Sequence, residues 1–226
     1  MRLVFVHGAL VRDGAWWWSR MAPLLAEAGI DSVAVELPSC GGGGDLHDDA
    51  AAVRAALEAS DEPALLCGHS YGGMVITEAA APPARRLIFI DSFLPELGES
   101  IATLASGPPP YEPAGEGLVR LKPALMPLFV HDCDDEAVAG AEARLTAQSS
   151  VVFGQSPHSV GWRTLPSTYV VCAEDRATPP ALQRAQARRA SEVVELAAGH
   201  HPFLSQPAAL AELIIRCGEQ TDLPVR

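Results

Sequence analysis

The sequence is poor in lysine and contains no long apolar run. Lys122 is its only lysine, acidic residues outnumber basic residues by 28 to 16, and the formal net charge is -12 at pH 7. A surface of this sign repels a phosphate backbone, so nucleic-acid binding is disfavoured. No stretch approaches the roughly 18 continuous apolar residues that span a bilayer, and the first apolar run stops at His7, too early for a signal peptide. We therefore expect a cytoplasmic protein whose partner is a small molecule and not a membrane.

Disulfide and metal-binding patterns are also missing. The five cysteines are widely scattered, without the spacing of a zinc site or a redox pair: Cys40, Cys67, Cys133, Cys172 and Cys217. Such an odd, unpaired set favours a reducing compartment. Two segments, 47–49 and 131–135, contain ligand types for a metal, but neither has a second ligand set at a recognisable spacing. We interpret both as acidic helix N-termini and expect no metal site.

Short apolar runs alternate with alanine-rich stretches along most of the 226 residues, of which 48% are hydrophobic. This alternation predicts parallel strands joined by crossover helices, in one α/β domain with a large core. The predicted strands cover residues 3–6, 32–37, 64–67, 87–90, 168–172 and 192–196. The predicted helices cover residues 16–28, 46–59, 71–80, 180–190 and 208–217. All six strands are apolar enough to be covered on both faces.

The alternation stops between residues 92 and 165. This segment is rich in proline and contains one expected helix, over residues 134–148. A structureless loop of that length is uncommon inside a compact domain, so we expect a small helical cap packed on the sheet. The chain then divides into an α/β core formed by residues 1–91 and 166–226 and an inserted cap region formed by residues 92–165.

Residues 68–72 read Gly-His-Ser-Tyr-Gly and lie between an apolar strand and a helix. Glycines on both sides of the serine permit the sharp strand-to-helix turn that raises a serine hydroxyl above a sheet, and the N-terminus of the following helix favours negative charge. Ser70 is therefore the candidate nucleophile. Two backbone N–H donors are expected for the oxyanion of acyl transfer: Tyr71, directly after the serine, and Ala9, in the loop after the first strand.

A serine nucleophile needs a general base, and the base needs an acid that orients it. In this architecture both follow later strands, in the order acid and then histidine. Asp175 follows the fifth predicted strand, and His200 follows the last one. Asp91, at the end of the fourth strand, and Glu174 are the alternative acids, and His201 is the alternative base. We favour Asp175 and His200, the latter because it directly follows a glycine turn.

Five side chains are assigned to the substrate pocket: Trp17, Phe129, His131, Phe153 and His201. The run of three tryptophans at 16–18 follows the oxyanion loop and can form an aromatic wall, but packing of the first helix on the sheet is the simpler interpretation of most of it. We expect His7 to brace its loop and His69 to lie buried under the turn, so neither is taken as a base.

The segments 7–9, 68–73, 171–175 and 199–204 together resemble the α/β-hydrolase superfamily. More narrowly, they resemble the branch that contains plant methyl-salicylate esterases and hydroxynitrile lyases, together with many bacterial esterases. The resemblance covers nearly the whole chain and is weakest in the cap. It implies an α/β-hydrolase fold with about six mainly parallel strands, helices on both faces and a small helical cap. It also implies that the first two strands of larger relatives are absent and that no cofactor is used.

The hydroxynitrile lyases of this branch carry a threonine in the first oxyanion loop and a lysine directly after the catalytic histidine. This chain has Gly8 and His201 at those positions, so the charge that stabilises cyanide is missing and hydrolysis is expected. The expected function is a serine hydrolase that cleaves a small, neutral carboxylic ester through an acyl-enzyme on Ser70. The alternatives are a lactone or thioester hydrolase, a C–C lyase or cyclase using the same triad, and a non-catalytic ligand receptor. The oligomeric state is left open, a homodimer included.

Overall fold

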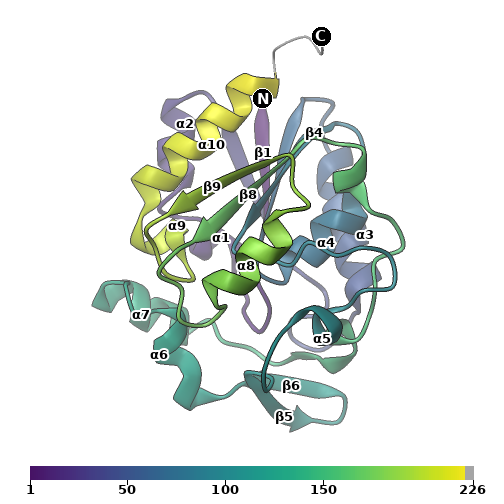
Figure 1. Cartoon of the computed structure of the whole chain (residues 1–226), viewed down its shortest axis with the longest axis vertical. Coiled ribbons are helices and arrows are strands. Elements are labelled where there is room, and N and C mark those ends of the chain that lie inside the picture. Colours follow the sequence, from purple (N-terminus) through teal and green to yellow (C-terminus); the bar gives the residue numbers. More distant parts are fainter. Residues whose placement is uncertain (222–226) are drawn as a thin grey trace.

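The computed structural model describes residues 1–221, which are built around a six-stranded sheet (Figure 1). The strand order is β2-β1-β3-β4-β8-β9, and every neighbouring pair runs parallel. The strands are β1 (Arg2–Val6), β2 (Asp31–Val35), β3 (Ala64–His69), β4 (Ala84–Ile90), β8 (Ser167–Cys172) and β9 (Glu192–Leu196). All six predicted strands are present, so the predicted sheet is confirmed.

Helices cover both faces of this sheet, as predicted. On one face α2 (Ala22–Glu27) packs against α10 (Pro207–Thr221) (Figure 1). On the other face α3 (Leu46–Glu58) packs against α4 (Gly72–Ala79), and α8 (Pro180–Ala187) lies beside them on β8. The result is a three-layer α/β arrangement in which the central strands form the core.

The two edge strands are less covered than the sequence suggested. β3 and β8 are buried at every residue, whereas β2 and β9 alternate between more and less exposed residues. A strand at the edge of the sheet has a neighbour on one side only, and the helices pack mainly over the middle of the sheet. The prediction that all six strands are covered on both faces is therefore wrong for β2 and β9.

The first predicted helix, over residues 16–28, is divided in two. α1 (Gly14–Trp17) ends well before α2 begins, and Pro23 lies in the first turn of α2. Proline has no N–H to continue the hydrogen bonds of a preceding helix, so it starts a new one. The turn between the two helices carries Trp18 onto the sheet, where its ring stacks on Phe5 with the centroids 4.0 Å apart.

The cap region contains a small sheet that the sequence did not predict. Its strands β5 (Tyr111–Gly115), β6 (Leu118–Leu121) and β7 (Gln148–Ser149) pair antiparallel in that order. The remaining cap elements are α5 (Ile101–Leu104), η1 (Pro123–Leu125), α6 (Met126–Phe129), α7 (Asp135–Glu142), η2 (Ser150–Phe153) and η3 (Gly161–Arg163). The cap is thus a mixture of short helices and strands and not the purely helical unit that was expected.

The helix predicted over 134–148 stops at Glu142 because the following residues pair with the loop after β1. Leu145 forms a β-bridge with Val11, and the N–H of Thr146 donates to the carbonyl of Leu10 at 2.9 Å. Tertiary hydrogen bonds here override the helical propensity of an alanine-rich segment. The pairing also holds the cap directly against a loop of the core.

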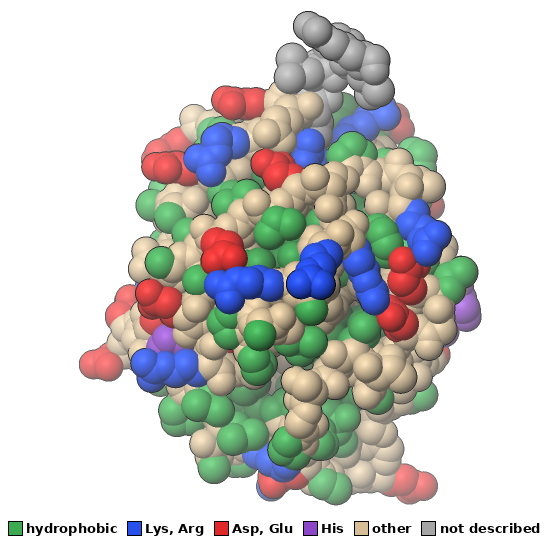
Figure 2. Space-filling model, in the orientation of Figure 1, with side chains coloured by type: hydrophobic (Ala, Val, Ile, Leu, Met, Phe, Trp, Pro, Cys, Tyr) green, Lys and Arg blue, Asp and Glu red, His purple; other side chains and the backbone are tan. Residues whose placement is uncertain are grey.

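The cap lies below the main sheet in Figure 1, and hydrophobic side chains gather over this part of the surface in Figure 2. Higher on the same face, basic and acidic side chains are interspersed; Arg184, for example, pairs with Glu195 at 2.7 Å. All five cysteines are free. Within residues 1–221, no helix is both long enough and apolar enough to cross a membrane.

Candidate active site

Ser70 occupies the sharp turn between β3 and α4. Its backbone φ is 51°, in the left-handed region that costs a non-glycine residue about 1–3 kcal/mol and is typical of functional positions. Hydrogen bonds hold the turn: the Ser70 N–H donates to the carbonyl of Ile90 at 3.2 Å, and its carbonyl accepts from Ser92 Oγ at 2.7 Å. A Cβ on Gly72 would lie 2.4 Å from the carbonyl oxygen of Val6, so only glycine fits where the new helix starts against β1.

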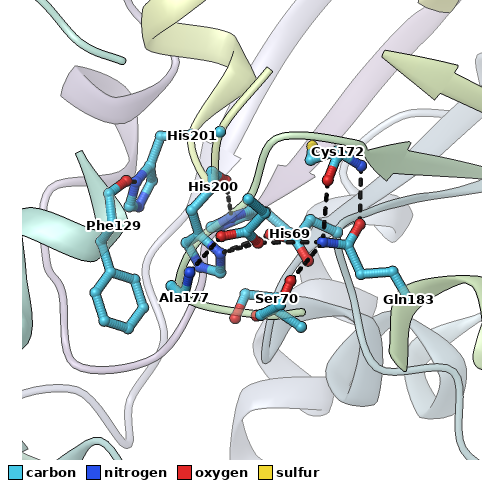
Figure 3. Close-up of polar contacts among 12 residues, drawn as sticks. His69, Ser70, Phe129, Cys172, Ala177, Gln183, His200 and His201 are labelled. Carbon is cyan, nitrogen blue, oxygen red and sulfur yellow. Dashed lines mark hydrogen bonds and ion pairs between the residues drawn. The ribbon is translucent and has the colours of Figure 1, made fainter. Parts of the chain in front are cut away.

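His200 follows β9 and places its ring beside Ser70, as Figure 3 shows. The ring is buried and lines the same cavity as Ser70. Two carboxylates approach its Nδ1 atom: Asp175 Oδ2 lies at 2.9 Å and Asp91 Oδ2 at 2.6 Å. The Nδ1 edge of the imidazole therefore faces the two acids, and the ring itself lines the cavity beside Ser70.

The two acids differ in how they are held. Asp175 Oδ1 accepts from the N–H of Ala177 at 2.7 Å, and Oδ2 accepts from Gln183 Nε2 at 3.1 Å and from His200 Nδ1. Within the described residues, the oxygens of Asp91 make no hydrogen bond of good geometry, in spite of the short distance to Nδ1. The directional bond of His200 therefore goes to Asp175, which the sequence favoured, while Asp91 lies close as a second acid.

The charges around His200 shift the pKa of all three groups. Burial by itself lowers the pKa of His200, but Asp91 and Asp175 outweigh it and raise that pKa. Burial also opposes ionisation of Asp175, yet the charge of His200 and the hydrogen bonds that Asp175 accepts lower its pKa. Burial and the nearby Asp175 raise the pKa of Asp91 well above its usual range. Of the two acids, Asp175 is therefore the more readily ionised.

Burial lowers the pKa of two further histidines beside His200, namely His69 and His201. His69 is buried under the turn, with Nε2 2.9 Å from the carbonyl oxygen of His200, and burial lowers its pKa well below the usual value. His201 stacks on Trp17 and donates from Nδ1 to the carbonyl of Phe129 at 2.8 Å. Burial and the neighbouring His200 lower the pKa of His201 to about 3. His201 therefore brings no positive charge into the cavity.

The loop after β1 passes directly over the serine turn. A Cβ on Gly8 would lie 3.0 Å from His69 Nδ1 and 3.2 Å from Ser70 Cβ, so glycine allows this close approach. Within residues 1–221, the backbone N–H groups of Ala9 and Tyr71 donate to no other protein group. Both predicted oxyanion donors thus remain available to a ligand, on two loops that lie against each other.

A buried polar chain links these two loops, and no sequence motif marks it. The N–H of Leu10 donates to Gln148 Oε1 at 2.8 Å, and Gln148 Nε2 donates to Ser39 Oγ at 2.8 Å. Ser39 Oγ donates to Asp49 Oδ2 at 2.6 Å, which also accepts from Tyr71 Oη at 2.5 Å. The cap residue Gln148 thereby helps to fix the position of the oxyanion loop relative to the serine turn.

The cap also holds the loops of the acid and the base. Asp132 Oδ2 accepts from the N–H of Gly199 at 2.6 Å, directly before the candidate base. His131 donates from Nε2 to the carbonyl of Glu174 at 3.0 Å, directly before the candidate acid. His131 was assigned to the pocket, but it is not among the lining residues, because this hydrogen bond turns its ring toward the Glu174 loop. Glu174 itself contributes its backbone carbonyl.

The cavity above Ser70 has a volume of about 350 Å³ and lies between the core loops and the cap. Of the five side chains assigned to it, four line it: Trp17, Phe129, Phe153 and His201. The cap side of the wall includes Tyr111, whose ring centroid is 4.3 Å from that of Phe153. No Lys, Arg, Asp or Glu residue of the described chain is among the lining residues. The wall of the cavity is therefore largely apolar, and its polar side chains include those of the candidate catalytic residues Ser70 and His200.

Comparison with known proteins shows which family and which structures this chain is similar to. The model of the alpha/beta hydrolase family matches residues 3–213. The pyrethroid hydrolase of Sphingobium wenxiniae is 27% identical over 94% of this chain and 85% of its own length. The polyneuridine aldehyde esterase of Rauvolfia serpentina is 26% identical over 94% of this chain and 93% of its own. Among solved structures, a pyrethroid hydrolase from Sphingobium faniae has a TM-score of 0.84 at 27% identity, covering 99% of this chain and 98% of that chain.

The chain therefore belongs to the alpha/beta hydrolase family, and the predicted fold class is confirmed. Its relatives and structural neighbours also include the esterases of the branch that the sequence motifs resembled. Since several of these similarities extend over almost the whole chain and include proteins named as esterases and ester-cleaving hydrolases, the protein is a carboxylic ester hydrolase.

Proposed function

We propose that this enzyme hydrolyses neutral, apolar carboxylic esters through an acyl-enzyme formed on Ser70. The observation that carries the proposal is the strained serine turn at the wall of a largely apolar cavity, next to a histidine that faces two carboxylates. A serine hydroxyl becomes an effective nucleophile when such a base accepts its proton.

The proposed reaction has two halves. Ser70 Oγ attacks the ester carbonyl while the Nε2 atom of His200 accepts its proton, and the N–H groups of Ala9 and Tyr71 stabilise the oxyanion. His200 then returns the proton to the departing alcohol, which leaves an acyl group on Ser70. In the second half His200 accepts a proton from water, whose oxygen attacks the acyl carbonyl. The bond between the acyl carbon and Ser70 Oγ then breaks, His200 returns the proton to Oγ, and the acid is released. Asp175 keeps the proton of His200 on Nδ1, so that Nε2 is free to act as the base.

The cavity supports a neutral and apolar substrate. Placing a charged group among side chains with no opposite charge carries a large desolvation cost. A volume of about 350 Å³ lies near the lower end of pockets for small organic molecules. The similarity to a pyrethroid hydrolase supports testing small aryl and alkyl esters first.

In the part of the chain that the structure describes, the cavity lacks the lysine that hydroxynitrile lyases of this branch use to stabilise cyanide. Lys122 donates from Nζ to the carbonyl of Pro109 at 2.8 Å and is not among the lining residues. His201, which occupies the position of the lyase lysine, has its pKa lowered to about 3. With no lysine or arginine among the described residues of the cavity wall and no charge on His201, ester hydrolysis is the function that we propose.

Active-site labelling with a fluorophosphonate, followed by peptide mass spectrometry, tests the nucleophile. We expect stoichiometric modification of the Ser70 peptide in the wild type and none in Ser70→Ala. Ser106→Ala is the matched control, because Ser106 lines the same cavity, and it should label like the wild type. Labelling or ester turnover that persists at the wild-type level in Ser70→Ala would refute the proposal.

A paired set of esters tests the substrate class. Each neutral aryl or alkyl ester is compared with an analogue of similar size that carries a carboxylate or an ammonium group. We expect kcat/KM to fall by at least about 10-fold for either charged analogue, because the cavity offers no partner for the charge. Equal rates for neutral and charged members would contradict the proposed substrate class while leaving the Ser70 mechanism in place.

A further inference from the structure

Three side chains of metal-ligand type meet outside the active-site cavity. His47 lies in the first turn of α3, Glu78 near the end of α4, and His158 in the cap segment between η2 and η3. His47 Nδ1 is 2.9 Å from Glu78 Oε2, and His158 Nδ1 is 3.7 Å from Glu78 Oε1. None of the three lines the active-site cavity. They form a separate His-Glu-His cluster, built from residues far apart in the sequence.

The carboxylate of this cluster is buried without a permanent cation beside it. The Glu78 side chain is 4% exposed, and its only side-chain ion-pair partners within residues 1–221 are the two imidazoles. Arg54 is nearby, but its guanidinium donates to the backbone carbonyl of Glu78 at 3.3 Å. A buried carboxylate is stable when it is paired or when it coordinates a metal. Glu78 already accepts from His47 Nδ1 and from the backbone N–H of His158, the latter at 3.1 Å, and a bound cation would add a fixed positive charge to these contacts.

The three side chains lie within reach of one ion, but His158 has to leave its place on the His47 ring to coordinate it. The imidazoles of His47 and His158 stack with their centroids 3.7 Å apart and their planes 6° from parallel, so their in-plane lone pairs do not converge in this arrangement. One ligand atom from each of the three side chains lies within 4.8 Å of the others, and in a tetrahedral zinc site bonds of roughly 2.0–2.2 Å put ligand atoms about 3.3 Å apart. The His158 side chain is 73% exposed, so it has room to turn out of the stack and direct a ring nitrogen at the ion.

We propose that His47, Glu78 and His158 bind one divalent first-row transition ion, represented by Zn²⁺, which fastens the cap to helices α3 and α4. Two imidazoles and one carboxylate form a recognised zinc ligand set. Polar bonds already dock the same cap segment: Gln155 Oε1 accepts from the N–H of Leu46 at 2.9 Å, and Gln155 Nε2 donates to Asp45 Oδ2 at 2.9 Å. The ion would add a stronger link at this seam.

This site differs from the expectation of no metal for residues 47–49. The sequence alone did not connect His47 with further ligands, because Glu78 and His158 lie 31 and 111 residues further along the chain. Only the packing of α3 against α4 and the return of the cap bring the three side chains together.

Zn²⁺ binding to chelator-treated full-length protein tests the proposal by titration calorimetry. We expect one ion per chain in the wild type, and a rise in Tm of about 5–10 °C at 100 times the Kd. His158→Ala and Glu78→Gln should abolish both effects. His131→Ala is the matched control, because this histidine lies outside the cluster, and it should still bind the ion. His158 is exposed, so its replacement is not expected to unfold the chain.

The active-site histidines are the competing location for an ion. His69, His200 and His201 also place ligand atoms within 4.8 Å of one another. Zinc binding that survives in His158→Ala and Glu78→Gln but disappears in His200→Ala would overturn the proposal, as would the absence of binding in the wild type. The visible spectrum of protein-bound Co²⁺ provides a second measurement, and we expect it to disappear in His158→Ala and to persist in His200→Ala.

Discussion

The two carboxylates beside His200 lead to a quantitative prediction. In a serine triad with one acid, replacing that acid with its amide lowers kcat by about 10⁴. Here Asp91 Oδ2 lies 2.6 Å from the same Nδ1 that bonds to Asp175. Once Asp175 is replaced by asparagine, Asp91 is the only acid beside the imidazole and can ionise. We therefore expect Asp175→Asn to lower kcat by only about 10² and not by about 10⁴, because Asp91 takes over part of the role of Asp175.

The two single variants and the double variant together measure how far Asp91 can replace Asp175. Asp91→Asn should lower kcat by only about 3-fold, because Asp175 keeps its hydrogen bonds from Ala177 and Gln183. The double variant should lose the full factor of about 10⁴. The product of the single losses is about 300-fold, so the excess corresponds to a coupling of about 2 kcal/mol, within the range for residues in contact. Circular dichroism of each variant checks that the fold is retained.

The pH dependence of kcat/KM gives an independent readout, because its acid limb reports the pKa of the base in the free enzyme. His200 acts as a base only when neutral, and Asp91 and Asp175 both raise its pKa. Removing one carboxylate disfavours the imidazolium, lowers the pKa and moves the acid limb to lower pH. A shift to higher pH in Asp91→Asn, or a greater loss of kcat there than in Asp175→Asn, would refute the reasoning.

Three further predictions concern residues that hold the loops. Gly8→Ala places a Cβ 3.0 Å from His69 Nδ1, so it should displace the loop that carries the oxyanion donor Ala9. We expect kcat to fall by about 10² with little change in KM, as on loss of an oxyanion donor; an unchanged kcat would contradict the role of this loop. Gln148→Ala leaves the N–H of Leu10 without its acceptor and should lower the free energy of unfolding in urea by about 1–3 kcal/mol, whereas the exposed control Gln206→Ala should change it little. Asp132→Ala removes the acceptor of the Gly199 N–H and should lower kcat in ester assays while changing KM less. A variant with an altered KM and an unchanged kcat would contradict this, because it would place the role of Asp132 in substrate binding.

Local sequence signals were sufficient for the sheet and for the serine turn. Each central strand is a short apolar run, and glycine is needed beside Ser70 because a Cβ on Gly72 would lie 2.4 Å from a backbone oxygen of β1. Both features are encoded within about ten residues, so they can be recognised from one segment at a time. The order of acid and histidine after later strands followed from the parallel topology.

Long-range contacts explain what the sequence did not reveal. Gln148 reaches the N–H of Leu10 across 138 residues, and Asp132 reaches that of Gly199 across 67. Neither residue stands in a motif, because its role is defined only by the partner that the fold supplies. The small cap sheet was missed for a related reason: Pro113 interrupts the strand pattern of β5, and β7 is only two residues long.

The acyl-enzyme on Ser70 is the central claim, and an aryl carbamate tests it most directly, because carbamoyl-enzymes are hydrolysed slowly enough to be collected. The enzyme is mixed with excess carbamate, the released phenol is counted, and the protein is analysed by intact and peptide mass spectrometry. We predict about one phenol released per chain, together with a carbamoyl group on the Ser70 peptide. Release of phenol from a protein that stays unmodified at Ser70, or equal release by Ser70→Ala, would contradict this claim.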